Sequence, residues 1–197
     1  MSDAEQAGDI TMVRSVAPRI IGLIGYGGAG KTTVASILRA DLGFVGSHIK
    51  TPIANMARSL LRDFGIADDM IERYIDGDLK RDVIPEIGKS ATYLQQTIGF
   101  DWGREKIRSD LWLGLWLLKT DAALAAGQRV VQESVRAVDE VAPIYERKGI
   151  IIEVRRPEID IKPGSHKSEI LPCAADAVID NDGSIDDLRQ KVLSLVG

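Results

Sequence analysis

The chain has 197 residues, of which 45% are hydrophobic and 27% are charged, and this length suits one domain or one domain with insertions. Its 25 basic and 29 acidic side chains leave a net charge of −4, which excludes a general attraction to a nucleic acid polymer or to an anionic membrane. Cys173 is the only cysteine, so no disulfide can form within the chain, and a reducing cytoplasm is the expected location.

Residues 1–18 are expected to form a flexible polar tail ahead of one domain over residues 19–197. The tail has neither the apolar core of a signal peptide nor the Arg-rich amphipathic pattern of a transit peptide. The longest apolar stretch, residues 111–118, is too short to span a bilayer and lies inside a helical pattern. We therefore expect no membrane partner.

A phosphate-binding loop follows the apolar run of residues 20–24. Residues 25–32 read Gly-Tyr-Gly-Gly-Ala-Gly-Lys-Thr and open a helix-like stretch, and this context disfavours a plain glycine turn. The glycines let backbone N–H groups surround a triphosphate, Lys31 can reach the β- and γ-phosphates, and the Thr32 hydroxyl can ligate Mg²⁺. The predicted ATP-binding residues of this segment are Gly25, Gly27, Gly28, Ala29, Gly30, Lys31, Thr32 and Thr33.

Short β-rich runs alternate with helical periods along the chain. The runs cover residues 20–25, 44–49, 129–133, 150–154 and 177–180, and this rhythm predicts a parallel sheet in an α/β fold. The first helix is expected from residue 30 to about residue 41. The last helix should begin after Ser184, a good N-cap with Asp187 three residues later.

About eighty residues separate the second run from the third, far more than one crossover helix needs. A helical insertion is therefore predicted over residues 51–126, with helices at 51–64, 90–98 and 104–126. A second irregular segment, residues 155–172, is predicted to be a lid over phosphates, because prolines and a glycine accompany its basic side chains. These side chains are Arg155, Arg156, Lys162, His166 and Lys167.

The loop alone does not set the class, because hydrolases, motors, switches and small-molecule kinases all use one. The chain is compact, its insertion could hold an acceptor, and it has a basic lid segment. Phosphoryl transfer to a substrate requires that water be excluded, which a lid can achieve. These features favour a kinase.

A series of short segments adds a family resemblance. It comprises residues 25–32, 49–52, 93–99 and 102–104, Trp112, residues 130–136 with Glu140, and residues 166–169 and 179–183. In order and spacing the series resembles the phage-type deoxynucleoside monophosphate kinases, of the P-loop nucleoside monophosphate kinase superfamily. The resemblance implies a three-layer α/β/α fold with a five-stranded parallel sheet. It also implies transfer of the ATP γ-phosphoryl to a (deoxy)nucleoside 5′-monophosphate, with Mg²⁺, giving the diphosphate and ADP.

Cations must converge on the moving phosphoryl group, because the protein mainly positions two polyanions and neutralises their charge. The catalytic candidates are Lys31, Arg104, Arg136, Arg155 and Arg156, of which one of the last two is expected to act. The acceptor candidates are Lys50, Gln95, Trp102 and Arg104, with Gln95 offering both a donor and an acceptor to a base edge. Trp102 could equally be a core residue, and Trp112 is expected to be one.

An acidic residue at the third strand should hold Mg²⁺ through water. The family usually carries Asp directly before the Val-Arg pair, whereas this chain has Ser134 there and Glu133 one step earlier. Because strand side chains alternate faces, the shift by one residue is not equivalent. Glu133 could still reach the metal from the strand's end, so Thr32 and Glu133 are the metal candidates.

Two further pairs of residues each allow two interpretations. Asp182 and Gly183 lie where adenine often rests against the backbone in this class, and they also suit an ordinary turn. Lys80 or Arg81 could bind the acceptor's phosphate, although such charged stretches are usually solvated. His48 is expected to be structural.

Two alternative functions also stay open. A dephospho-coenzyme A kinase or another small-metabolite kinase shares the early loop and the late Asn-Asp-Gly turn. A nucleotide-binding switch with little turnover is suggested by the displaced acidic residue. The resemblance allows a homodimer to which residues 111–118 contribute, and core burial explains that stretch equally well. Which bases the protein accepts, and whether it prefers deoxyribose, leave no readable pattern.

Overall fold

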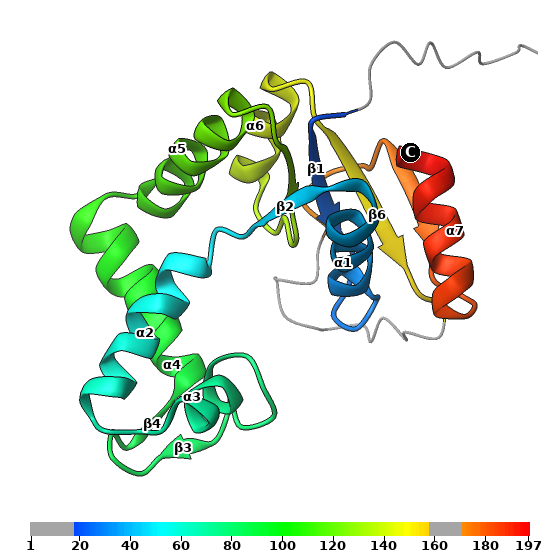
Figure 1. The fold of residues 1–197 in the computed structure, drawn as a ribbon. Helices are drawn as coiled ribbons and strands as arrows, with labels where there is room; N and C mark the ends of the chain where they lie inside the picture. The colour runs from blue at the N-terminus through cyan, green and yellow to red at the C-terminus, as the bar shows by residue number, and fades with distance from the viewer. Residues whose placement is uncertain (1–17, 158–170) are drawn as a thin grey trace, which may run out of the picture.

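The computed structural model describes residues 18–157 and 171–197, and a five-stranded parallel sheet lies at its centre (Figure 1). The strand order is β2-β5-β1-β6-β7, so the strand that precedes the phosphate-binding loop is central. The predicted strands are confirmed, with ends that differ by at most two residues. They are β1 (Ile20–Ile24), β2 (Phe44–Ser47), β5 (Arg129–Gln132), β6 (Ile150–Arg155) and β7 (Ala177–Asp180).

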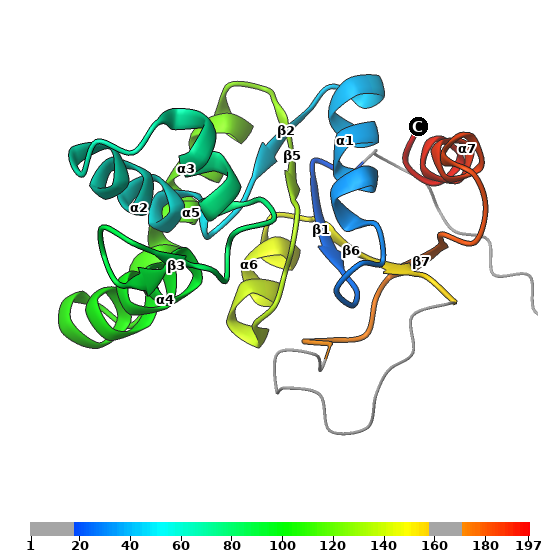
Figure 2. The same ribbon diagram turned by 90° about the horizontal axis from the view of Figure 1, so that it is seen from below.

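Helices cover both faces of the sheet, as the three-layer prediction requires (Figure 2). On one face, α1 (Lys31–Leu42) and α7 (Ile185–Val196) pack over Ile21 and Leu23. On the other, α5 (Leu111–Ala125) and α6 (Val141–Glu146) pack over Ile20 and Ile24. Successive side chains of β1 thus enter opposite cores, so every residue of this strand is buried.

The ends of the flanking helices follow the predicted signals. Helix α1 runs from Lys31 to Leu42, and the left-handed φ of 68° at its C-cap, Gly43, suits a glycine. Helix α7 follows Ser184, whose hydroxyl accepts from the Asp187 backbone N–H while the Asp187 carboxylate accepts from the Ser184 backbone N–H. This reciprocal capping box fixes where the chain turns from β7 into α7.

Between β2 and β5 the chain forms a mainly helical region that projects away from the sheet in Figure 1. It has its own small core, to which Ala57, Leu61, Ile71 and Ile84 contribute. The elements are α2 (Thr51–Asp63), α3 (Asp68–Ile75), β3 (Val83–Ile84), β4 (Lys89–Ser90), α4 (Ala91–Gln96), the π-helix η1 (Thr97–Ile107) and α5. A 3₁₀ turn, η2 (Val138–Glu140), follows β5.

The predicted single helix over residues 104–126 is wrong. The chain leaves the helical conformation at Arg108, which is extended at φ −163° and ψ 132°, and α5 starts only at Leu111. The wide turns of η1 bring Gly103 against the Trp112 ring, so the two segments pack on each other. Helix α3 and the β3–β4 hairpin were not predicted either.

None of the helices in residues 18–157 and 171–197 is both long and apolar enough to cross a membrane. Most of the predicted lid, including Lys162, His166 and Lys167, lies outside the described residues.

Candidate nucleotide-binding site

The phosphate-binding loop joins β1 to α1 at the carboxyl edge of the sheet. Gly30 has a φ of +103°, and a Cβ at this position would overlap the Asn181 side-chain nitrogen. Gly25 has a φ of +139°, and a Cβ there would overlap the Val154 carbonyl oxygen. The loop therefore needs glycine at these two positions both for backbone conformation and for space.

The loop geometry fits a triphosphate. The Lys31 ammonium lies inside the loop, where Nζ donates to the carbonyl oxygens of Gly25 at 2.7 Å and Tyr26 at 2.9 Å. The first-turn N–H groups of α1 have no partner within the helix, and its N-cap, Gly30, brings no capping side chain. The start of α1 therefore offers backbone donors and a favourable dipole to an anion.

The loop forms one wall of a cleft of about 550 Å³ between the sheet and the helical region. The cleft's other walls come from the start of α2, the end of α3, α4 and the segment after β5. Five cations and one carboxylate line it within the described chain, so its potential is positive. These charged residues are Lys31, Lys50, Lys80, Arg81, Arg136 and Asp76.

Burial and mutual repulsion act on the lysines of the cleft. Burial is the main cause that lowers the pKa of Lys31, and the nearby Arg136 guanidinium lowers it further. The same two causes, in the same order, lower the pKa of Lys50. Because like charges are held together here, a bound polyanion would relieve the repulsion among them.

Ser134 positions Arg136. The Ser134 hydroxyl accepts from Arg136 Nε at 3.1 Å, and the Arg136 backbone N–H donates to the Glu140 carboxylate at 3.3 Å. Burial raises the pKa of Glu140 to about 7. The serine that stands at the family's usual Asp position therefore orients a cleft cation.

His48 has the structural role that was predicted for it. Its Nδ1 accepts from the Lys50 backbone N–H at 3.1 Å. Burial lowers the His48 pKa to about 4, with further lowering by Lys50 and Arg136. The ring is therefore neutral near pH 7, and its proton lies on Nε2.

Gln95 reaches the cleft from α4, and its Nε2 donates to the Ile75 carbonyl at 3.3 Å. The structure does not bring the other two acceptor candidates to the cleft walls. Trp102 is 42% exposed, and Arg104 Nη1 lies 4.0 Å from Asp139 Oδ2, beside the segment that carries Arg136. Trp112 is a core residue as expected, and its Nε1 donates to the Gly99 carbonyl at 2.6 Å.

Arg155 and Arg156 are also absent from the described lining of the cleft. Arg155 is held by a bidentate ion pair in which Nε and Nη2 donate to the Glu153 carboxylate at 2.9 and 2.8 Å. Arg156 is exposed at the start of the predicted lid.

The two metal candidates contact different parts of α1, because Thr32 lies in its first turn and Glu133 pairs with Arg39, about two turns farther along. Thr32 is exposed in the first turn, next to the loop. Glu133 accepts from Arg39 Nη1 at 2.7 Å, and Arg39 Nη2 also donates to Ser36 Oγ at 3.1 Å. Among residues 18–157 and 171–197 no three His, Cys, Asp or Glu side chains form a metal cluster. Mg²⁺ needs no such cluster, because it binds through one or two protein ligands with substrate phosphates and water.

The turn after β7 is attached to the loop. Asn181 Nδ2 donates to the Ala29 carbonyl at 2.9 Å, and the Asn181 backbone N–H donates to the Arg155 carbonyl at 2.7 Å. Asp182 pairs with Lys191 of α7 at 2.5 Å. The predicted adenine-side residues, Asp182 and Gly183, therefore follow a residue that touches the phosphate-binding loop.

No family model matches the chain. A curated protein named "Putative deoxynucleotide monophosphate kinase", from Acanthamoeba polyphaga mimivirus, is 27% identical over 199 residues, covering 90% of this chain and 95% of that protein. The resemblance to the deoxynucleoside monophosphate kinases is confirmed.

Two solved structures are more distantly similar. A dephospho-CoA kinase from Campylobacter jejuni is 15% identical with a TM-score of 0.39, over 90% of this chain and 95% of that one. A shikimate kinase from Acinetobacter baumannii, in complex with shikimate, is 19% identical with a TM-score of 0.42, over 93% of this chain and 94% of that one. Because both TM-scores are low, the assignment of the fold rests on the strand order and the loop geometry.

Three residues of the site were missed from the sequence. Asn181 was seen only as part of a turn, although an Asn directly after a strand that ends near the loop is a usable signal. Glu153 interrupts the apolar run of β6 and is 7% exposed. Ser134 was noted as a departure from the family pattern, but its bond to Arg136 has no signature in the sequence.

Proposed function

We propose that the protein transfers the γ-phosphoryl of ATP to a nucleoside 5′-monophosphate, with a deoxynucleotide as the expected acceptor. The observation that carries this proposal is the cleft, in which a phosphate-binding loop faces further cations across a space large enough for a second substrate. The 27% identity to a protein named as a deoxynucleotide monophosphate kinase supports the deoxynucleotide acceptor.

On the donor side, the loop would hold the ATP phosphates through the first-turn N–H groups of α1. Lys31 would exchange its bonds to the Gly25 and Tyr26 carbonyls for phosphate oxygens. Asp182 and Gly183 would border the adenine. When bound, Mg²⁺ would neutralise charge on the phosphates, with Thr32 as a direct ligand and Glu133 as a ligand through water.

On the acceptor side, Lys50, Lys80 and Arg81 offer cations to the 5′-phosphate, and Gln95 offers a donor and an acceptor to the base. Trp102 and Arg104 lie on the helical region outside the described lining, so they would have to move to reach the acceptor. Such movement is common where a kinase closes over its substrates.

Arg136 lines the cleft together with Lys31 and Lys50, and its Nε donates to Ser134, which suits it to stabilise the moving phosphoryl group. Arg104, and Arg155 or Arg156, would add charge upon closure of the predicted lid. Exclusion of water by that closure would direct the phosphoryl group to the acceptor rather than to water.

The test is ADP formation from Mg-ATP with a panel of deoxy- and ribonucleoside monophosphates and dephospho-coenzyme A. We expect turnover with at least one deoxynucleotide. Lys31→Ala should lower kcat/KM by about 100-fold or more, because a cation at the transferring phosphate contributes several kcal/mol. Lys89→Ala, which removes an exposed lysine on the β3–β4 hairpin, is the matched control and should leave the rate unchanged.

Turnover with dephospho-coenzyme A alone would move the protein to another class of small-metabolite kinase. Saturable ATP binding without acceptor-dependent turnover would contradict the proposal and would favour a nucleotide-dependent switch.

A further inference from the structure

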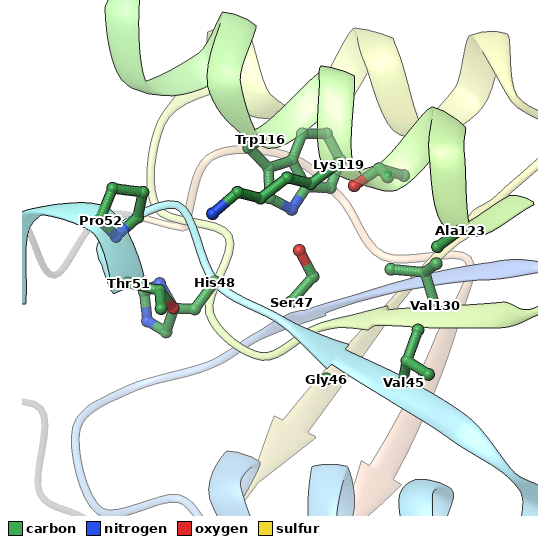
Figure 3. Close-up of a pocket in the computed structure, with 11 residues that line it drawn as sticks. Val45, Gly46, Ser47, His48, Thr51, Pro52, Trp116, Lys119, Ala123 and Val130 are labelled. Atoms are coloured by element: carbon green, nitrogen blue, oxygen red, sulfur yellow. The ribbon is translucent and has the colours of Figure 1, made fainter. Parts of the chain in front are cut away.

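A second cavity, of about 260 Å³, lies between β2, the start of α2, and α5 (Figure 3). It shares no lining residue with the nucleotide cleft. The turn of residues 48–51 separates the two, since it contributes His48 and Thr51 to this cavity and Lys50 to the cleft. None of the functional roles proposed above uses this cavity.

Two buried polar side chains that line this cavity have no hydrogen-bond partner, and a third, Gln132, lies nearby outside the lining. Trp116 and Thr120 of α5 line it at 3% and 1% exposure, and neither Trp116 Nε1 nor Thr120 Oγ1 has a hydrogen-bond partner. Gln132 of β5 is fully buried with both amide atoms unpartnered. The register pairs Gln132 with Ser47, so both side chains point to the face of the sheet that α5 covers.

These three residues account for four of the five unpartnered buried side-chain atoms in the described chain. Buried polar groups in folded proteins nearly always have a hydrogen-bond partner, because an unmade bond is costly. Two of these atoms, Trp116 Nε1 and Thr120 Oγ1, belong to residues of the cavity lining, and Gln132 shares this face of the sheet. Two unmade donors on one cavity wall therefore indicate that something polar occupies the cavity.

The lining favours an acceptor-rich ligand with one negative charge. The indole N–H of Trp116 can only donate, and Figure 3 shows the Trp116 ring above Ser47 of β2, with the end of the Lys119 side chain on the side of Pro52. No carboxylate belongs to the described lining. Lys119 is the one ammonium group there, whereas a phosphate dianion is usually held by several cations.

The remaining walls suit a hydrocarbon group. Val45 and Val130 are registered partners on neighbouring strands, and both line the cavity together with Pro52 and Ala123. The volume lies just below the range typical of sites for drug-sized ligands, so the occupant must be small.

We propose that this cavity is a second binding site, for a small organic carboxylate. The carboxylate oxygens accept from Trp116 Nε1, Thr120 Oγ1 and Lys119 Nζ, and the hydrocarbon part rests against Val45 and Val130.

The test follows the indole N–H resonances of the full-length ¹⁵N-labelled protein while benzoate, butyrate or inorganic phosphate is added. The chain has three tryptophans, and Trp116→Phe assigns the resonance that matters. The Trp112 N–H already donates to Gly99, so its resonance serves as an internal control. The readout is independent of kinase activity.

We expect benzoate or butyrate to shift the Trp116 resonance saturably and phosphate to leave it in place. Thr120→Val keeps the side-chain shape and Lys119→Met keeps its length, and each should raise the carboxylate Kd by about tenfold or more. Lys89→Met, on the distant hairpin, should not change the Kd. The proposal fails if no carboxylate shifts the resonance up to about 20 mM, if phosphate alone shifts it, or if binding survives both cavity substitutions.

Discussion

Asn181 packs so closely on Gly30 that a side chain at position 30 should destabilise the fold. Gly30→Ala places a methyl group where the Asn181 amide now lies, at a backbone φ of +103° that residues with a Cβ rarely adopt. Gly27 belongs to the same loop, yet a Cβ there would meet nothing within 4 Å. Gly27→Ala is therefore a matched control for adding a methyl group to the loop.

The size of the effect follows from two contributions. A strained backbone conformation costs about 1–3 kcal/mol. Displacing Asn181 also breaks its 2.9 Å bond to the Ala29 carbonyl, which contributes about 1 kcal/mol. We expect Gly30→Ala to lower the free energy of unfolding by about 2–4 kcal/mol, and Gly27→Ala to change it by less than about 1 kcal/mol.

A double-mutant cycle in urea separates the two contributions. Asn181→Ala alone should cost about 1 kcal/mol, but it should cost nothing further in Gly30→Ala, where the bond to Ala29 is already broken. If the two substitutions are additive, or if Gly27→Ala is as destabilising as Gly30→Ala, this account of the loop is wrong.

Three other predictions concern residues 133–140, the segment after β5. Because Glu140 binds its proton more tightly in the folded state, the free energy of unfolding should fall by about 3 kcal/mol as pH rises from about 4.5 to above 7. In urea denaturation, Glu140→Gln should remove this dependence on pH. An unchanged dependence in the variant would refute the assignment to Glu140. Ser134→Ala frees the Arg136 side chain and should lower kcat about five- to tenfold with little change in the ATP KM. An equal loss in Arg136→Ala and in the double variant would show that Ser134 acts through Arg136. An unaltered kcat in Ser134→Ala would contradict that role. Glu133→Gln should raise the Mg²⁺ concentration for half-maximal rate about tenfold if Glu133 holds the metal through water, while Lys89→Met on the β3–β4 hairpin should not. Identical Mg²⁺ curves for wild type and Glu133→Gln would exclude Glu133 as a ligand.

The sheet and its flanking helices could be predicted because their signals are local. The β1 sequence is apolar throughout since both its faces are buried, and the glycine-rich loop and the Ser184 cap each lie within a few residues. The break at Arg108 could not be predicted in this way, because it depends on the packing of Gly103 against Trp112 across two segments.

In the candidate site, too, residues with local sequence signals could be predicted and long-range contacts could not. Of the catalytic candidates, Lys31 and Arg136 line the cleft, and of the acceptor candidates, Lys50 and Gln95 do. The sequence did not predict that Ser134 fixes Arg136. Nor did it predict that Asn181, which lies far along the chain from the loop, donates to the Ala29 carbonyl. Such contacts depend on the relative placement of strands, and a single sequence carries no direct signal for that placement.

Phosphoryl transfer can be followed with labelled γ-phosphoryl ATP in the presence of Mg²⁺ and deoxynucleoside monophosphates. We expect the label to appear in a deoxynucleoside diphosphate, and we expect Lys31→Ala to abolish this transfer while Lys89→Ala preserves it. Label that appears only as inorganic phosphate, or that stays in ATP with every acceptor, would contradict the account.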